Sequence, residues 1–236
     1  MPFWSVLGVS LAAALGYGWL IARHDRSDPE PWYMLMLAGV LGVGAGYVSG
    51  WVADWLSKRL HIPLQSDWFP LLVIAPEEEL LKFLPVLLLF FFSRHFNDPF
   101  DGLIYGVFVG LGYSTEEAIW YWRYFERGVL EVIARAVVAF PLHAMTTGIA
   151  CYSLGLIKFR VRRAVWLTPV GLLTAMLLHG LWDYFAHDFD RWSVVVVFLL
   201  VVVVFGWMMA MGKWRSARQF GEQPGAVRDR TVSNSN

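Results

Sequence analysis

Cysteine and charge are both scarce in this sequence. Cys151 is the single cysteine among 236 residues, so an intrachain disulfide and a cysteine-based metal cluster are excluded. Charged residues make up 16% of the chain, whereas soluble domains carry about a quarter. The 19 lysines and arginines balance the 19 aspartates and glutamates, and this net charge of zero argues against a nucleic-acid partner.

Apolar residues dominate instead. They form 57% of the chain, its mean hydropathy is +0.50, and its 13 tryptophans and 9 tyrosines are residue types that favour the two membrane interfaces. We therefore predict an all-α fold, a polytopic transmembrane helical bundle of about seven spans in a lipid bilayer. Apolar runs of roughly 20 residues, the length that crosses a bilayer, lie at 3–22, 31–52, 69–92, 103–122, 132–157, 164–185 and 192–211.

These runs predict a single transmembrane domain over residues 1–217, because no soluble stretch is long enough to form a second core. The polar residues 218–236 predict a disordered C-terminal tail. The first run has no basic segment before it and is too long for a signal-peptide core, so we expect it to be a retained span.

The third run contains charges that a membrane span does not tolerate without a reason. Residues 75–82 read Ala-Pro-Glu-Glu-Glu-Leu-Leu-Lys. Each central charge costs roughly 2.5–3.5 kcal/mol on insertion scales. At about 100° per residue, Glu78, Glu79 and Lys82 fall within an arc of about 100°. They are therefore expected to face the bundle interior or a water-filled cavity.

Three further runs also carry ionisable residues. Tyr113 and Glu117 are one helical turn apart, as are His179 and Asp183, and His143 lies in the fifth run. Each residue alone has a structural alternative, such as an interface position for a carboxylate or a packing role for a histidine. An ionisable residue inside a span is by default a functional-site hypothesis, and here four runs each supply at least one. The set as a whole therefore predicts a site between the spans.

The chemistry that fits this set is water activation. An ionised glutamate can take a proton from water that attacks a peptide carbonyl, and histidines can donate hydrogen bonds to the resulting oxyanion. Lys82 would anchor a glutamate or neutralise the cluster. A zinc site built from His143, His179 and a glutamate is chemically possible, but no His-Glu-x-x-His motif or other specific spacing supports it. We therefore predict no metal and no cofactor.

The order of these motifs resembles that of the PrsW family, part of the larger group of CAAX-processing and bacteriocin-processing membrane proteases. The order is Glu-Glu-x-x-Lys, aromatic-x-x-x-Glu, His, and His-x-x-x-Asp, and the similarity runs from about Asp25 to Asp183. Supporting context is the Pro-Glu-Pro sequence at 29–31 and the Phe-Asp-Gly sequence at 100–102. The residues that the resemblance makes catalytic are Glu78, Glu79, Lys82, Glu117, His143, His179 and Asp183.

The resemblance implies an intramembrane endopeptidase of the glutamic type that needs no obligatory metal. Known members cleave a membrane-bound anti-sigma factor, so a single-span membrane protein is the expected substrate. Two positions depart from the family pattern: Tyr113 replaces the usual phenylalanine, and Ala118 replaces a common asparagine. Glu77 adds a third carboxylate, which leaves open which glutamate is the base.

Two other functions remain open from the sequence. A proton- or cation-coupled transporter uses similar carboxylates near the bilayer midplane, although no inverted repeat of the polar motifs is present. A non-catalytic membrane scaffold would keep the fold and tolerate alanine at Glu78 and Glu79.

The charge of the predicted loops indicates an orientation. Ten lysines and arginines lie on the side of the loops after the first, third and fifth runs, and five lie on the other side. Those five are Lys58, Arg59, Arg123, Arg127 and Arg135. The positive-inside rule then predicts an outside N-terminus and a cytoplasmic C-terminus in the cell membrane. Because Glu78 lies about 15 Å into a span entered from outside, we expect the site to open toward the extracellular side.

Overall fold

The computed structural model describes residues 2–25, 28–63, 66–125, 129–159, 161, 164–187 and 191–219, and these contain helices but no strand. Two segments, η1 and η2, are π-helical turns on either side of a short α-helix. The elements are α1 (Phe3–Ala22), α2 (Trp32–Leu60), η1 (Pro70–Ile74), α3 (Ala75–Pro85), η2 (Val86–Phe90), α4 (Asp101–Phe125), α5 (Val129–Lys158), α6 (Ala164–His187) and α7 (Arg191–Gln219).

The predicted all-α membrane bundle is confirmed, since each of the seven apolar runs is helical. Five helices, α1, α2, α5, α6 and α7, are long and apolar enough to cross a bilayer. The segment η1–α3–η2 and helix α4 fall outside this set, and they are the elements that carry Glu77–Glu79, Lys82 and Glu117. Helix α7 continues to Gln219 and so includes the first two residues of the tail predicted over 218–236, whose remaining residues lie outside the described part of the chain.

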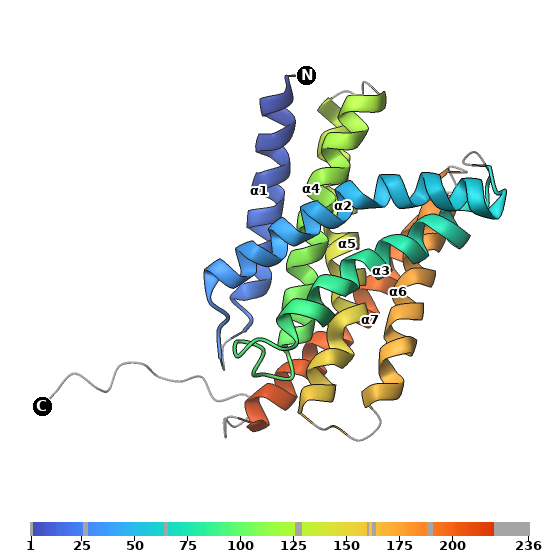
Figure 1. The fold of residues 1–236 in the computed structure, drawn as a ribbon. Coiled ribbons are helices and arrows are strands. Elements are labelled where there is room, and N and C mark those ends of the chain that lie inside the picture. The colour runs from blue at the N-terminus through green and yellow to red at the C-terminus, as the bar shows by residue number, and fades with distance from the viewer. Residues whose placement is uncertain are drawn as a thin grey trace, which may run out of the picture.

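Helices α4 and α5 form the centre of the bundle. Helix α4 packs against α1, α2 and α5, and α5 also contacts α6 and α7. Figure 1 shows α2 crossing α1 and α4, after which the chain turns back so that α3 runs alongside α2. Helix α3 also contacts α6 and α5. The short α3 is thereby enclosed by helices on several sides, which is the position that a charged segment requires inside a membrane.

Proline and irregular turns set the length of α3. Pro76 stands in its first turn, directly after the π-helical turn η1, and Pro85 is its last residue. A five-residue π-helical turn flanks the helix on each side. Such turns are found mostly as local bulges, often at functional sites. The charged residues of the third run therefore lie on one regular α-helix of 11 residues, so their helical spacing holds.

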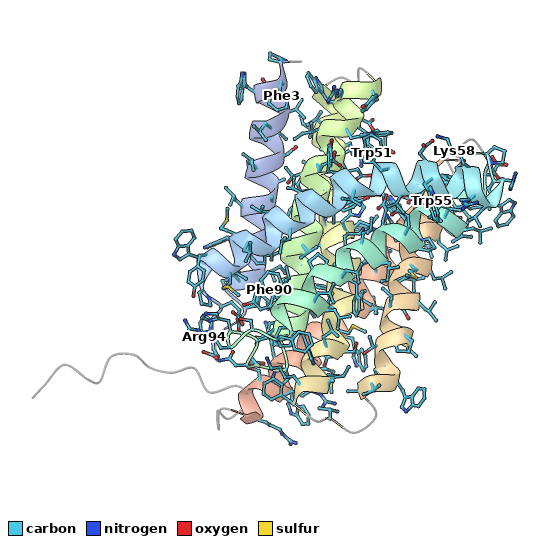
Figure 2. The ribbon with its side chains drawn as sticks, viewed as in Figure 1. Phe3, Trp51, Trp55, Lys58, Phe90 and Arg94 are labelled. Carbon is cyan, nitrogen blue, oxygen red and sulfur yellow. The ribbon has the colours of Figure 1, made fainter. Side chains whose placement is uncertain are left out.

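The crossing of α2 over α4 depends on glycine. A Cβ atom at Gly112 would overlap the carbonyl oxygen of Gly39, and one at Gly42 would overlap the carbonyl oxygen of Val109. The two backbones are thus in direct contact, as is common where small residues meet at membrane helix crossings. Beyond the crossing, α2 presents Trp51 and Trp55 outward, with 70% and 57% of their surfaces exposed (Figure 2). Such side chains are suited to contact lipid.

We expect Gly112→Ala to destabilise the protein by about 1–3 kcal/mol, because the added methyl group forces the α2–α4 crossing apart. Gly44→Ala is the control. Gly44 lies on α2, the other helix of the crossing, but an added Cβ there meets nothing within 4 Å. The free energy of unfolding of the purified protein in detergent measures both. Equal stability of the two variants would show that the crossing tolerates a wider spacing.

Candidate active site

Helix α3 supplies a buried row of three carboxylates and one ammonium group. Glu77 and Glu78 are 6% and 7% exposed, and Glu79 and Lys82 are fully buried. Lys82 lies one turn after both Glu78 and Glu79, so all three side chains extend from one face of the helix. Removing several charges from water costs several kcal/mol per ion, so each one needs partners within reach.

Lys82 is at the centre of these contacts. Its Nζ atom lies 2.8 Å from Glu79 Oε1, 3.0 Å from His143 Nδ1 and 3.6 Å from Glu78 Oε2. The ring of Tyr113 covers the ammonium group at 4.3 Å from the ring centroid, a cation–π distance. The lysine thus joins α3 to α4 and α5, and its positive charge faces two carboxylates at once.

The contacts of His143 define its tautomer. An ammonium group can only donate, so Nδ1 of His143 accepts the hydrogen bond from Lys82. The ring proton is then on Nε2, which lies 2.9 Å from Glu117 Oε2 and donates to it. Glu117 in turn accepts from Arg135, whose Nη2 atom is 2.5 Å from the same oxygen. His143 is therefore held as a neutral ring between a cation and an anion.

His179 lies between carboxylates. Its Nδ1 atom is 2.9 Å from Glu79 Oε1, and its Nε2 atom is 3.4 Å from Asp183 Oδ2 and 3.7 Å from Glu78 Oε2. The ring meets that of His143 edge to face, with 4.7 Å between centroids. A proton on Nε2 therefore points at a gap between two carboxylates and is not used up by a short hydrogen bond.

Glu78 and Glu79 differ in how their oxygens are satisfied. Glu79 accepts hydrogen bonds from Lys82 and from the hydroxyl groups of Thr146 at 2.9 Å and Thr147 at 3.4 Å. Glu78 Oε2 is buried yet accepts no hydrogen bond from the described part of the chain, and its near neighbours are Lys82 and His179. Glu79 is thus an anchored carboxylate, whereas Glu78 keeps a free acceptor oxygen.

All seven residues named from the sequence are brought together by α3, α4, α5 and α6. Glu77, the third carboxylate, belongs to a neighbouring group: it accepts from Ser49 at 2.5 Å, and Ser49 accepts from the Tyr113 hydroxyl at 2.9 Å. The Tyr113 hydroxyl, which the phenylalanine usual at this position would lack, therefore has a hydrogen-bond partner on α2. Ala118, the other departure, lies in the apolar core at 1% exposure.

Four residues of the site were missed from the sequence. Ser49, Thr146 and Thr147 are small polar residues in apolar helices, and only the helical spacing of Thr146 and Thr147 from His143 hinted at a shared face. Arg135 was counted as a loop charge, but it is largely buried against Glu117 and the Tyr121 ring. Its position inside the fifth apolar run was the available signal.

The donor set also fits a divalent metal by type and spacing. Ligand atoms of Glu78, His143 and His179 lie within 4.8 Å of one another, and two histidines with one glutamate is a common catalytic zinc set. These residues would hold the ion, which when bound would polarise a carbonyl or a water molecule. The Lys82 ammonium already lies 3.0 Å from His143 Nδ1 and supplies positive charge in the same place.

Comparison with known proteins gives a consistent result. The family model described as "PrsW family intramembrane metalloprotease" matches residues 30–209. Protease PrsW of Bacillus subtilis (strain 168) is 29% identical over 208 residues, covering 87% of this chain and 91% of the relative. Protease PrsW of Clostridioides difficile (strain 630) is 30% identical over 206 residues, covering 84% and 85%. No solved structure matches the chain.

The matched region contains η1–α3–η2 and helices α4, α5 and α6, and with them every residue of the cluster around Lys82. The expected resemblance is therefore confirmed over most of the chain, and this protein belongs to the PrsW family of intramembrane proteases.

Proposed function

We propose that this membrane peptidase hydrolyses a peptide bond with water activated by Glu78. The observation that carries the proposal is the buried Glu78 Oε2, which accepts no hydrogen bond from the described residues and faces Lys82 and His179. A general base must have an acceptor oxygen free to take a proton from water. Glu79 is less suited, because both of its oxygens already accept hydrogen bonds.

The reaction proceeds in two proton transfers. Glu78 takes a proton from water while the water oxygen forms a bond to the scissile carbonyl carbon. The carbonyl oxygen becomes an oxyanion, and the Nε2–H of His179 donates to it, since that group makes no short hydrogen bond to the described residues. The protonated Glu78 then gives its proton to the leaving amine as the carbon–nitrogen bond breaks, which restores the starting carboxylate.

The remaining residues position these two. Asp183 orients the His179 ring from one helical turn away, and Glu79 flanks its other nitrogen. Lys82 keeps the centre electrically balanced and is itself oriented by His143, which Glu117 and Arg135 hold in place. The proposed substrate is a single-span regulatory membrane protein of the anti-sigma-factor type, as the family resemblance implies. The two histidines and Glu78 lie between helices, where an unwound substrate segment would enter from the bilayer.

We expect Glu78→Gln to lower activity and Glu79→Gln to lower stability. Glu78→Gln should lower kcat by about a hundredfold to ten-thousandfold with little loss of stability, because glutamine keeps the shape but cannot take the proton. Glu79→Gln should destabilise the protein by about 3–5 kcal/mol, because it leaves the buried Lys82 short of a counter-charge.

Cleavage of candidate single-span proteins in cells, at matched expression, measures the first effect, and unfolding of the purified variants measures the second. Asp54→Asn is a control, since this carboxylate pairs with Lys58 on the surface of α2. If the Glu78→Gln variant cleaves the substrate at the wild-type level, Glu78 is not the base.

We expect cleavage to survive complete removal of metal ions, because Lys82 supplies the positive charge near His143 and Glu78. The measurement is elemental analysis of purified, active protein before and after chelation, with cleavage assayed on the same samples. One zinc ion per chain, lost together with activity and restored by added zinc, would contradict the metal-free reaction. The ion would then belong to Glu78, His143 and His179.

The proposed orientation, with an outside N-terminus, can be tested at two exposed residues. Lys58 and Arg94 lie toward opposite ends of the α2–α3 hairpin (Figure 2). We expect Lys58→Cys to react with an impermeant thiol reagent added outside intact cells, and Arg94→Cys to react only after the cells are opened. Cys151 is buried and gives little background. The reverse pattern would place the site's opening on the cytoplasmic side.

A further inference from the structure

Three buried polar side chains connect α2 to the active site by hydrogen bonds. Glu77 is the first of the three consecutive carboxylates on α3, and the proposed reaction uses only the two that follow it. Glu77 Oε1 accepts from the Ser49 hydroxyl on α2 at 2.5 Å, and Ser49 accepts from the Tyr113 hydroxyl on α4 at 2.9 Å. These two bonds link a carboxylate that has no role in the reaction to a ring that borders the active site.

The donors and acceptors fix the direction of this link. Each hydroxyl has one proton, so Tyr113 donates its proton to Ser49 and Ser49 donates its own to Glu77. The carboxylate is thus the terminal acceptor, and its other oxygen, Oε2, is buried without a hydrogen bond from the described residues. Successive hydrogen bonds polarise one another, so the acceptor at Glu77 strengthens the bond that Tyr113 makes.

The ring of Tyr113 touches two groups of the active site. Its centroid lies 4.3 Å from Lys82 Nζ and 5.3 Å from the centroid of the His143 ring. A cation is attracted to an aromatic ring while it stays over the ring face, within about 6 Å of the centroid. A hydroxyl tethered at Ser49 fixes the tilt and the reach of the ring. It thereby fixes where the ammonium group lies beside Glu78.

The close crossing of α2 and α4 makes this link possible. Gly42, Gly46 and Ser49 follow one another at three- and four-residue spacing, so they lie on one face of α2. An added Cβ at either glycine would overlap atoms of α4. Ser49 is one turn further along the same face, close enough for its short side chain to reach both Glu77 and Tyr113. Phenylalanine at position 113 would cover Lys82 with a similar ring but could not reach Ser49.

We infer that Ser49 and Glu77 are positioning residues of the peptidase reaction. They hold the Tyr113 ring, and the ring fixes the Lys82 ammonium group beside Glu78. The inference rests on the proposed function, in which Glu78 activates water. A displacement of about 1 Å near the reacting atoms can slow a reaction about a hundredfold. Because none of the three linked side chains contacts the substrate in this reaction, their loss should lower kcat and leave KM almost unchanged.

The test measures cleavage by the purified protein in detergent, and the probe is a fluorescently tagged single-span membrane protein that the wild type cleaves. Tyr113→Phe keeps the ring and removes the hydroxyl, and Ser49→Ala removes the middle of the link. Each should lower kcat by about three- to thirtyfold and leave KM within about twofold. The double variant should be about as slow as the slower single variant, because both changes break the same link.

Two variants of Glu77 separate its role as an acceptor from simple packing. Glu77→Gln keeps an oxygen that can accept from Ser49, so its kcat should stay within about threefold of wild type. Glu77→Met has a similar length but no such acceptor, and it should be about as slow as Ser49→Ala.

Two further variants are matched controls. Tyr105→Phe removes another tyrosine hydroxyl of α4, one that donates to the Glu30 carboxylate about 12 Å along the helix axis from Tyr113. Ser10→Ala removes a buried hydroxyl of α1 that makes no hydrogen bond to the described residues. Both should keep the wild-type kcat, whatever their effect on the Tm.

The inference fails if Tyr113→Phe and Ser49→Ala cleave like wild type, or if their effects on kcat multiply in the double variant. It also fails if Glu77→Gln is as slow as Glu77→Met, since the carboxylate would then act by its charge. An equal loss of kcat in Tyr105→Phe would assign the effect to the fold as a whole.

Thermal unfolding of the same variants provides a measurement that needs no substrate. The Tm losses of Tyr113→Phe and Ser49→Ala should not add, and additive losses would show that the two hydroxyls are not linked. If Ser49→Ala does not fold, Tyr113→Phe and the two Glu77 variants decide the result. Failure of the proposed base is a separate outcome, because it is measured by Glu78→Gln alone.

Discussion

The buried ammonium group of Lys82 is the contact on which the rest of the site depends. Two unit charges 4 Å apart attract each other by about 4 kcal/mol at an effective dielectric of 20, while each buried ion loses several kcal/mol of hydration. Lys82 meets this cost with two carboxylates, a histidine nitrogen and an aromatic face, supplied by α3, α4 and α5. The carboxylates lie on α3, the histidine on α5 and the aromatic ring on α4, so these three helices must meet in one arrangement to surround the ammonium group.

This arrangement explains why the fold encloses a short, interrupted helix. Helix α3 has 11 residues between two π-helical turns, and its charged face would be unstable against lipid. Helices α2, α5 and α6 cover it, and the glycine contact between α2 and α4 brings Ser49 close enough to reach Glu77 and Tyr113. By contrast, the apolar windows of α1 and α7 are only 17% buried, and their exposed surfaces suit lipid. These apolar helices thus separate the polar interior from the lipid.

The sequence predicted which residues share one face of a helix, but not which residues of different helices contact each other. Helical spacing correctly grouped Glu78, Glu79 and Lys82 on one face of a helix, and apolar runs correctly located all seven helices. Spacing within one helix cannot tell which residue of another helix will be opposite. For that reason the hydroxyls of Thr146 and Thr147, which distinguish Glu79 from Glu78, could not be foreseen. Arg135 was counted with the loop charges although it lies inside the fifth apolar run, and its partner Glu117 allows it to lie inside the bundle.

Helix α4 connects two polar clusters that are balanced in different ways. At one end, Glu117 is paired with Arg135 and His143, so negative charge near the active site is compensated by side chains of the same chain. Side chains of the same chain thus supply the positive charge that keeps Glu117 ionised inside the bundle. At the other end, Asp101 and Glu30 form a hydrogen bond with each other, which requires one of the two carboxyl groups to hold a proton. A pair of buried carboxyl groups avoids the cost of two facing negative charges by holding a proton between them, so the polar groups at the two ends of α4 are neutralised by different means.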